Sequence, residues 1–300
     1  HKEYRRQRQM CIRDSRRLLD SAETRYREEG AGARELIDRL ARDSYEAMKP
    51  SWDDIRERGG AIAAAHMGNR QVRQAMKSYT ESLVMTQLMD APVLQRSYTK
   101  PLGYAGDFQV MNLILRNGFE GRSVFSRVFN KFGCEEELAA GVRTRKDLLK
   151  EIHLEEMRRV TQANPALDTF RVTSLGCGPA REVCELIEES SPLPCKSHWT
   201  LVDQEERALS LAHNDVFRAI ARTGAAASLR CLYMSFQQLV VDPSGTLEDG
   251  DQHLVYASGL FDYLNLARAQ ALTRALYDKA APGGLVVVAN AIWPCKSLWC

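Results

Sequence analysis

The chain has 300 residues, of which 44% are hydrophobic, and this is enough to fill the cores of two ordinary domains. Its formal net charge of +2 provides no overall positive field, so the composition argues against a protein that holds nucleic acid by bulk charge. No run of about eighteen apolar residues occurs and the N-terminus is rich in Arg and Gln, so we expect a soluble, cytoplasmic protein without a membrane span or secretory signal.

The eight cysteines are widely separated along the chain, with no Cys-x-x-Cys pair and no histidine at ligand spacing. This arrangement argues against both a zinc site and a disulfide framework. We therefore predict no metal ligands.

The sequence is predicted to divide into three parts. His1–Ser15 ends in Cys11-Ile12-Arg13-Asp14-Ser15 and resembles translated sequencing-adaptor sequence, so we expect a non-native leader there. Residues 16–164 form a predicted helical N-terminal region, because apolar residues recur at steps of three and four between charges. Its expected interruptions are Pro50, Gly59-Gly60, Pro92 and Pro101-Leu102-Gly103, and its last helix, about Glu135 to Gln162, should stop before Asn164-Pro165.

Residues 165–300 change to short β-rich runs that alternate with helical stretches. The helices are expected near 180–190, 205–222 and 266–280, and the strands at Phe170–Leu175, Trp199–Val202, Leu229–Tyr233, Leu254–Tyr256 and Leu285–Val288. This alternation indicates βαβ units and a parallel sheet, and hence an α/β fold.

The strongest local signal is the first of these strands, which runs into Gly176 and Gly178 and then into a helix. Glycines at such a turn allow the backbone to approach a ligand closely, and the helix that follows presents unpaired N–H groups. An ordinary strand-to-helix turn is the alternative, and the two glycines alone do not decide between them.

Two further features favour a ligand. Asp203 ends the next predicted strand, where a carboxylate can accept hydrogen bonds from both hydroxyls of a ribose, and Glu205 is a weaker candidate for the same role. Ser258 and Gly259 end the fourth predicted strand beside the first one, at the switch point where open sheets bind ligands.

A dinucleotide-binding enzyme would use a similar turn, but its fingerprint requires Gly or Ala where this chain has Arg181. The loop Gly176-Cys177-Gly178-Pro179-Ala180 instead resembles motif I of class I S-adenosylmethionine (SAM) methyltransferases, although Ser174 stands where many members carry an acid. The turn Pro282-Gly283-Gly284 resembles the segment that precedes the fifth strand in the same superfamily.

The resemblance implies a Rossmann-like sheet with SAM as cofactor. The residues it implies for cofactor binding are Ser174, Gly176, Cys177, Gly178, Pro179, Ala180, Asp203, Ser258 and Gly259. Because Trp293–Cys300 follows the fifth strand abruptly, we expect a C-terminally truncated domain without the final helix and last two strands, and with the fifth strand as an open edge.

An unusual passage, Arg96–Asp107, combines glycines, a proline, two tyrosines and opposite charges. It is either a lid over the cofactor pocket or a capped loop in which Asp107 serves the next helix. With Ser258–Leu264, this passage resembles a bacterial methyltransferase family assigned to synthesis of the extracellular factor 3-hydroxypalmitic acid methyl ester, over about residues 70 to 290. The resemblance implies carboxyl O-methylation of a 3-hydroxy fatty acid to give a diffusible signal ester.

A carboxylate is already nucleophilic at neutral pH, so such a transfer needs alignment and desolvation more than a general base. Cations and hydroxyls would orient the small acidic or lipid-like substrate, and the candidates are Tyr98, Lys100, Tyr104, Arg143 and Arg145. An acyl tail would need an apolar groove, for which Phe108, Met111, Leu113, Ile114, Leu115, Phe125 and Phe129 are available, although core packing explains these residues more simply.

Two other functions remain open. A non-catalytic sensor or interaction protein could use a degenerate SAM-binding fold as a scaffold for the helical region. Methyl transfer to nucleic acid is disfavoured by the near-neutral charge and by the absence of an Asn/Asp-Pro-Pro-Tyr/Phe motif after the fourth strand. The oligomeric state has no signal in the sequence.

Overall fold

The computed structural model describes residues 2–28, 32–241 and 251–291, with residues 2–13 described by their backbone only. Contacts divide the described chain into an N-terminal unit up to Val142 and a C-terminal unit from Arg143, whereas the periodicity of the sequence predicts the boundary at residues 164 and 165. The difference arises because one continuous helix, α8 (Glu137–Ala163), enters the C-terminal unit and packs Leu149 and Met157 into its core.

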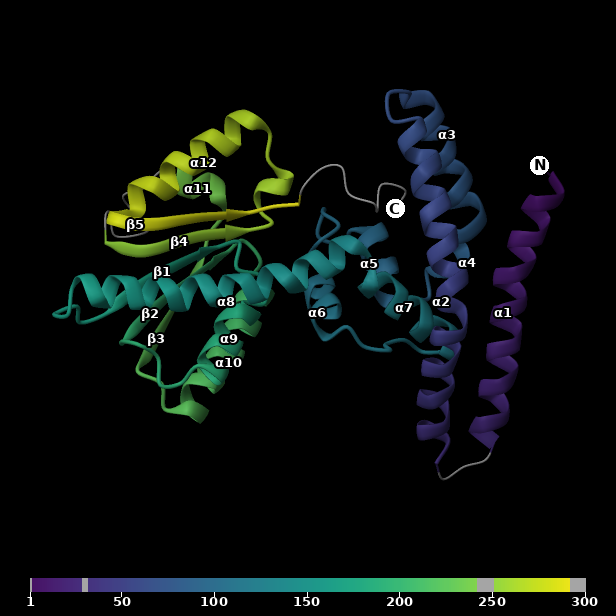
Figure 1. The fold of residues 1–300 in the computed structure, drawn as a ribbon, viewed down its shortest axis with the longest axis horizontal. Coiled ribbons are helices and arrows are strands. Elements are labelled where there is room, and N and C mark those ends of the chain that lie inside the picture. Colours follow the sequence, from purple (N-terminus) through teal and green to yellow (C-terminus); the bar gives the residue numbers. More distant parts are fainter. Residues whose placement is uncertain (1, 29–31, 242–250, 292–300) are drawn as a thin grey trace. The chain divides into compact units, whose positions relative to one another are not determined.

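The N-terminal unit is helical, as the sequence predicts (Figure 1). Its elements are α1 (Lys2–Glu28), α2 (Ala33–Ala65), α3 (Arg70–Thr80), the π-helical turn η1 (Glu81–Met85), α4 (Thr86–Leu88), α5 (Pro92–Thr99), α6 (Phe108–Arg116) and α7 (Val124–Glu135). The expected leader at residues 1–15 falls within α1, apart from residue 1, which lies outside the described residues. Its origin stays a prediction.

Helix α2 corrects one expectation, because it continues through both Pro50 and Gly59-Gly60. Two aromatic side chains on either side of Pro50 pack against the same ring of α7. Tyr45 and Trp52 lie with their ring centroids 4.7 Å and 5.0 Å from that of Phe132. These contacts hold both halves of the helix in line and offset the hydrogen bond that proline removes.

The apolar residues considered for an acyl groove are mostly used in the core of the N-terminal unit. Phe125 and Phe129 are 0% and 1% exposed, and their rings lie 4.5 Å apart. Phe108, Leu113 and Ile114 are also buried. Core packing therefore accounts for these side chains, which was the simpler of the two interpretations of the sequence.

The C-terminal unit is built on a parallel five-stranded sheet with the order β3-β2-β1-β4-β5. The strands are β1 (Phe170–Leu175), β2 (Ser197–Asp203), β3 (Ala227–Tyr233), β4 (Gln252–Ser258) and β5 (Ala280–Ala289). The helices are α9 (Arg181–Glu189), α10 (Glu206–Thr223), α11 (Phe236–Val241), α12 (Leu266–Lys279) and the 3-10 turn η2 (Phe261–Tyr263). The Rossmann-like α/β fold is thereby confirmed, and α11 and η2 are additions that the sequence did not predict.

Helices cover both faces of this sheet (Figure 1). On one face α8, α9 and α10 enclose a core that includes Trp199 and Tyr256, which are 0% and 1% exposed. On the other face α11 and α12 cover Val202, Val255 and their neighbours. Burial on both faces explains the near-continuous apolar runs of the central strands.

Strand β5 corrects the expected Pro282-Gly283-Gly284 turn, because these residues lie inside the strand. On β4, Gln252 pairs with Ala280 but Leu254 pairs with Leu285, so extra residues of β5 bulge out of the ladder. Gly283 has a φ of 77°, which a bulge accommodates with glycine. Among the described strands β5 has a neighbour on one side only, so it forms an edge as expected. The predicted closing segment Trp293–Cys300 lies outside the described residues.

Within the described residues, no helix is long and apolar enough to cross a membrane.

His153 on α8 is a buried titratable group in the C-terminal core. Its ring centroid lies 5.3 Å from that of Trp199 and 4.8 Å from that of Tyr256. Its Nδ1–H faces the carbonyl oxygen of Leu149, and its Nε2 has no hydrogen-bond partner in the described structure. Burial lowers the pKa of His153 to about 4, so the ring is neutral at pH 7.

This burial predicts a pH-dependent stability. Below the ordinary histidine pKa of about 6.5 the unfolded chain takes up a proton that the folded core excludes, so the free energy of unfolding should fall by about 3 kcal/mol between pH 6.5 and 4. His153→Phe keeps a ring between Trp199 and Tyr256 and should remove that part of the slope in urea titrations. Exposed His213, replaced by Gln, is the control and should keep it. An unchanged slope in His153→Phe would contradict the prediction.

Candidate functional site

The glycine loop turns sharply where β1 ends. Gly176 and Gly178 have φ values of 65° and 52°, which glycine adopts without strain. The N–H groups of Gly176 and Cys177 both donate to the carbonyl oxygen of Val202 on β2, at 2.8 Å and 3.0 Å. The loop is therefore attached to the neighbouring strand before the chain enters α9.

Ala180 completes this turn in an unexpected way. It is fully buried and has a φ of 46°, a left-handed conformation that is uncommon without glycine, and it immediately precedes α9. Cys177 is also buried, and burial raises the pKa of its thiol well above the usual range. Its environment therefore favours the neutral thiol, which fits packing better than nucleophilic chemistry.

The carboxylate of Asp203 closes the loop from the end of β2. Its Oδ2 accepts from the N–H of Gly178 at 2.8 Å, and its Oδ1 accepts from the N–H of Glu205 at 2.9 Å. Burial raises the pKa of Asp203, and backbone hydrogen bonds, including the one from Gly178, oppose the rise. Asp203 thus has a structural role in shaping the glycine loop that the sequence alone did not indicate.

The end of β4 lies beside β1, as expected from the strand order. Gly259 follows Ser258 with a φ of 84°, and its N–H donates to the carbonyl oxygen of Ala289 at 2.7 Å. A Cβ on Gly259 would come within 3.0 Å of Nη2 of Arg145. The guanidinium of Arg145 therefore lies directly against the backbone at the carboxyl end of β4.

A cluster of three polar side chains, Ser174 on β1, Tyr256 on β4 and Glu182 on α9, lies next to the glycine loop. The Tyr256 hydroxyl donates to Oε1 of Glu182 at 2.8 Å, and Tyr256 is the register partner of Ser174 on β1. Burial, followed by the charge of Glu182, raises the pKa of Tyr256, and the Ser174 hydroxyl opposes the rise. Neither Glu182 nor Tyr256 was a candidate from the sequence, since their meeting depends on how α9 packs against β4.

Ion pairs anchor the part of α8 that carries Arg145. Lys146 contacts Glu185 of α9, and Lys150 donates to the same carboxylate at 3.2 Å and to Glu189 at 2.9 Å. These contacts attach α8 to α9 immediately after Arg145 in the chain. The position of Arg145 relative to the glycine loop is thus supported by both helices.

The remaining substrate-side candidates are divided between the two units. Tyr98 and Lys100 in the N-terminal unit are exposed, Lys100 ends α5 in a left-handed conformation, and Tyr104 is half-buried. Arg143 belongs to the C-terminal unit together with Arg145. Their participation in substrate binding stays a prediction.

Asp107 has the capping role that was one of the two interpretations of its loop. Its Oδ1 accepts from the N–H groups of Gln109 and Val110 at the start of α6, at 3.0 Å and 3.1 Å. The same oxygen accepts from Nε of Arg96 at 2.7 Å. The passage is therefore a loop tied at both ends, and its proposed lid function stays a prediction.

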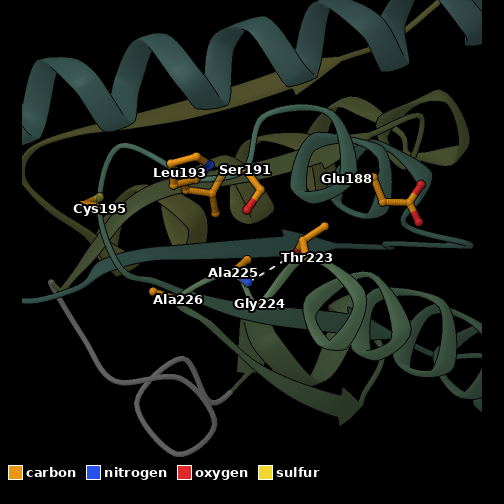
Figure 2. A pocket seen from close by; sticks show the side chains of 9 residues that line it. Glu188, Ser191, Leu193, Cys195, Thr223, Gly224, Ala225 and Ala226 are labelled. Atoms are coloured by element: carbon orange, nitrogen blue, oxygen red, sulfur yellow. Dashed lines mark hydrogen bonds between the residues drawn. The ribbon is translucent and has the colours of Figure 1, made fainter.

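A hollow of about 490 Å³ lies in the C-terminal unit, beside the segments that lead into β2 and β3 (Figure 2). Its lining includes Cys195 and Ala226, which precede β2 and β3, and Glu188 and Thr223 near the ends of α9 and α10. Because all described strands are parallel, this hollow lies at their amino ends. Ligands of open α/β sheets bind at the carboxyl ends, so we do not assign the hollow to the candidate site.

Comparisons with known proteins give distant structural likenesses. No family model matches the chain, and no curated protein matches it. The chain is similar to a solved SAM-dependent methyltransferase from Geobacter sulfurreducens in complex with S-adenosyl-L-homocysteine, with 17% identity over 45% of this chain and 47% of that one, and a TM-score of 0.30. Two carbon methyltransferases are also similar.

The DszA carbon methyltransferase has 13% identity over 83% of this chain and 54% of that one, with a TM-score of 0.44. The CurJ carbon methyltransferase has 15% identity over 68% of this chain and 53% of that one, with a TM-score of 0.39. The chain spans about half the length of these solved chains.

Proposed function

We propose that the C-terminal unit binds SAM on the glycine loop and that the protein is a SAM-dependent methyltransferase. The observation that carries the proposal is the loop after β1, which lies where the strand order reverses between β1 and β4. Open parallel sheets bind their ligands at such a switch point, outside the carboxyl ends of the strands.

The residues of the loop fit such a ligand. A Cβ on Gly178 would meet nothing within 4 Å, so there is open space where a ligand can approach the backbone. Asp203 uses one acceptor position on each carboxylate oxygen for Gly178 and Glu205, and a carboxylate offers about four in total. The ribose hydroxyls of SAM can therefore donate to Asp203 without displacing the bonds that shape the loop.

The acceptor that we propose is the carboxylate of a 3-hydroxy fatty acid or a similar small acid, which the sequence resemblance supports. SAM supplies an electrophilic methyl group on its sulfonium. A carboxylate needs no general base, so the protein would mainly align the two groups and exclude water. Within the C-terminal unit, Arg143 is the proposed orienting group.

The cofactor site predicts a specific effect of one methyl group. Gly178→Ala adds about 1 kcal/mol of backbone strain but meets no protein atom, so the variant should fold while the new methyl group occupies ligand space. We expect its affinity for S-adenosylhomocysteine, measured by calorimetry, to fall at least about tenfold.

Gly224→Ala is the matched control, because Gly224 ends α10 with a φ of 65° and also has nothing within 4 Å. It should bind with wild-type affinity. Equal affinities in the two variants would remove the glycine loop from the site, and a folded wild-type protein that binds no ligand would overturn the proposed cofactor.

The proposed acceptor predicts a methyl ester as product. Wild-type protein with SAM and 3-hydroxypalmitic acid should form the ester, detected by mass spectrometry, and Gly178→Ala should form less at limiting SAM. Binding of SAM without ester formation from any acid tested would contradict the acceptor and favour the non-catalytic scaffold. Salt-sensitive methylation of DNA or RNA would contradict it as well.

A further inference from the structure

Arg145 is a cation without a structural partner at the candidate site. In the part of the chain that the structure describes, its guanidinium forms no hydrogen bond or ion pair, although it is partly buried. Burial lowers the pKa of Arg145, and the charges of Asp262 and Glu182 oppose this effect. A guanidinium remains charged in proteins, so a partly desolvated one without a partner favours an anionic ligand.

Glu182 is an oriented carboxylate at the same site. It lies in the first turn of α9, directly after the glycine loop, and the Tyr256 hydroxyl fixes its Oε1. Burial raises the pKa of Glu182, while the hydrogen bond from Tyr256 and the charge of Arg145 oppose the rise. The carboxylate retains acceptor positions that a ligand can use.

The two charges face the carboxyl ends of adjacent strands. Glu182 follows the loop after β1, and Arg145 lies against Gly259 after β4. They influence each other's pKa but do not form an ion pair. Opposite charges that are held close without meeting provide complementary partners for a ligand group that carries both signs.

We propose that Glu182 and Arg145 form a clamp for the zwitterionic amino acid end of SAM, in which Glu182 accepts from the α-ammonium group and Arg145 donates to the α-carboxylate. The clamp rests on the proposed cofactor function. It assigns Arg145 to the cofactor rather than to the substrate carboxylate, which is the role that the sequence predicts.

The charge of Glu182 distinguishes these two assignments. A fatty acid carboxylate at Arg145 would bring a second negative charge close to Glu182, so that one guanidinium would face two carboxylates. The amino acid end of SAM brings an ammonium group together with its carboxylate, so both side chains gain an opposite charge. Charge-assisted hydrogen bonds of this kind are stronger than neutral ones.

Two ligands test the clamp, since S-adenosylhomocysteine carries the amino acid group and 5'-methylthioadenosine lacks it. Glu182→Gln keeps the hydrogen bond acceptor for Tyr256, and Arg145→Met keeps much of the side-chain length. Each variant should bind S-adenosylhomocysteine at least about tenfold more weakly in calorimetry, and methylthioadenosine within about twofold of wild type.

Glu206→Gln and Arg268→Met are the matched controls, because Glu206 lies in the first turn of α10, Arg268 lies in α12, and both are exposed. Both should bind the two ligands like wild type. Unchanged affinity for S-adenosylhomocysteine in Glu182→Gln and Arg145→Met would overturn the clamp, and so would an equal loss for both ligands. A wild-type protein that binds neither ligand would overturn the cofactor proposal itself. The methylthioadenosine titration distinguishes this outcome from failure of the clamp alone, in which wild-type protein still binds methylthioadenosine.

Discussion

The hydrogen bonds between the glycine loop and the end of β2 are the constraint on which the candidate site depends. Three successive features place the loop there: the carbonyl of Val202 receives two N–H groups, Asp203 receives the N–H of Gly178, and Ala180 takes a left-handed conformation before α9. Together they set the direction in which α9 begins. Every other group of the site is positioned relative to that helix or to the strands on either side of it.

Helix α9 connects the loop to the charged part of the site. Its first turn presents Glu182 to Tyr256 on β4, and further along Glu185 receives Lys146 and Lys150 from α8. Partly exposed ion pairs contribute little stability each, so their main effect here is to fix the register of α8 against α9. That register determines where Arg145 lies. The same packing buries His153, so the core and the site share one set of helix contacts.

The sequence predicted those parts of the fold that local chemistry determines. Strand β1 was predicted with its observed bounds, because an apolar run is followed directly by Gly176 and Gly178. The parallel sheet followed from the alternation of strands and helices. Helix α2 was expected to break at Pro50, but it continues because Tyr45 and Trp52 pack on Phe132. The sequence pattern did not show these contacts, since they join residues that are far apart in the chain.

The sequence predicted where the backbone of the site turns, but it did not predict which charged side chains meet there. The position of the glycine turn follows from spacing, but Glu182 and Tyr256 are 74 residues apart and meet only through the packing of α9 on the sheet. The structural role of Asp203 was hidden for the same reason, because its partners are backbone N–H groups whose directions depend on the turn. Sequence patterns carry periodicity and turn chemistry, whereas these contacts depend on how elements are oriented in three dimensions.

A crystal structure of the chain with S-adenosylhomocysteine would show directly whether the carboxyl ends of β1 and β4 form a cofactor site. We expect the ribose beside Asp203, the backbone of Gly178 against the ligand, and the amino acid group between Glu182 and Arg145. A ligand bound in the hollow near Cys195 and Thr223, or one whose amino acid group points away from both charges, would contradict this expectation.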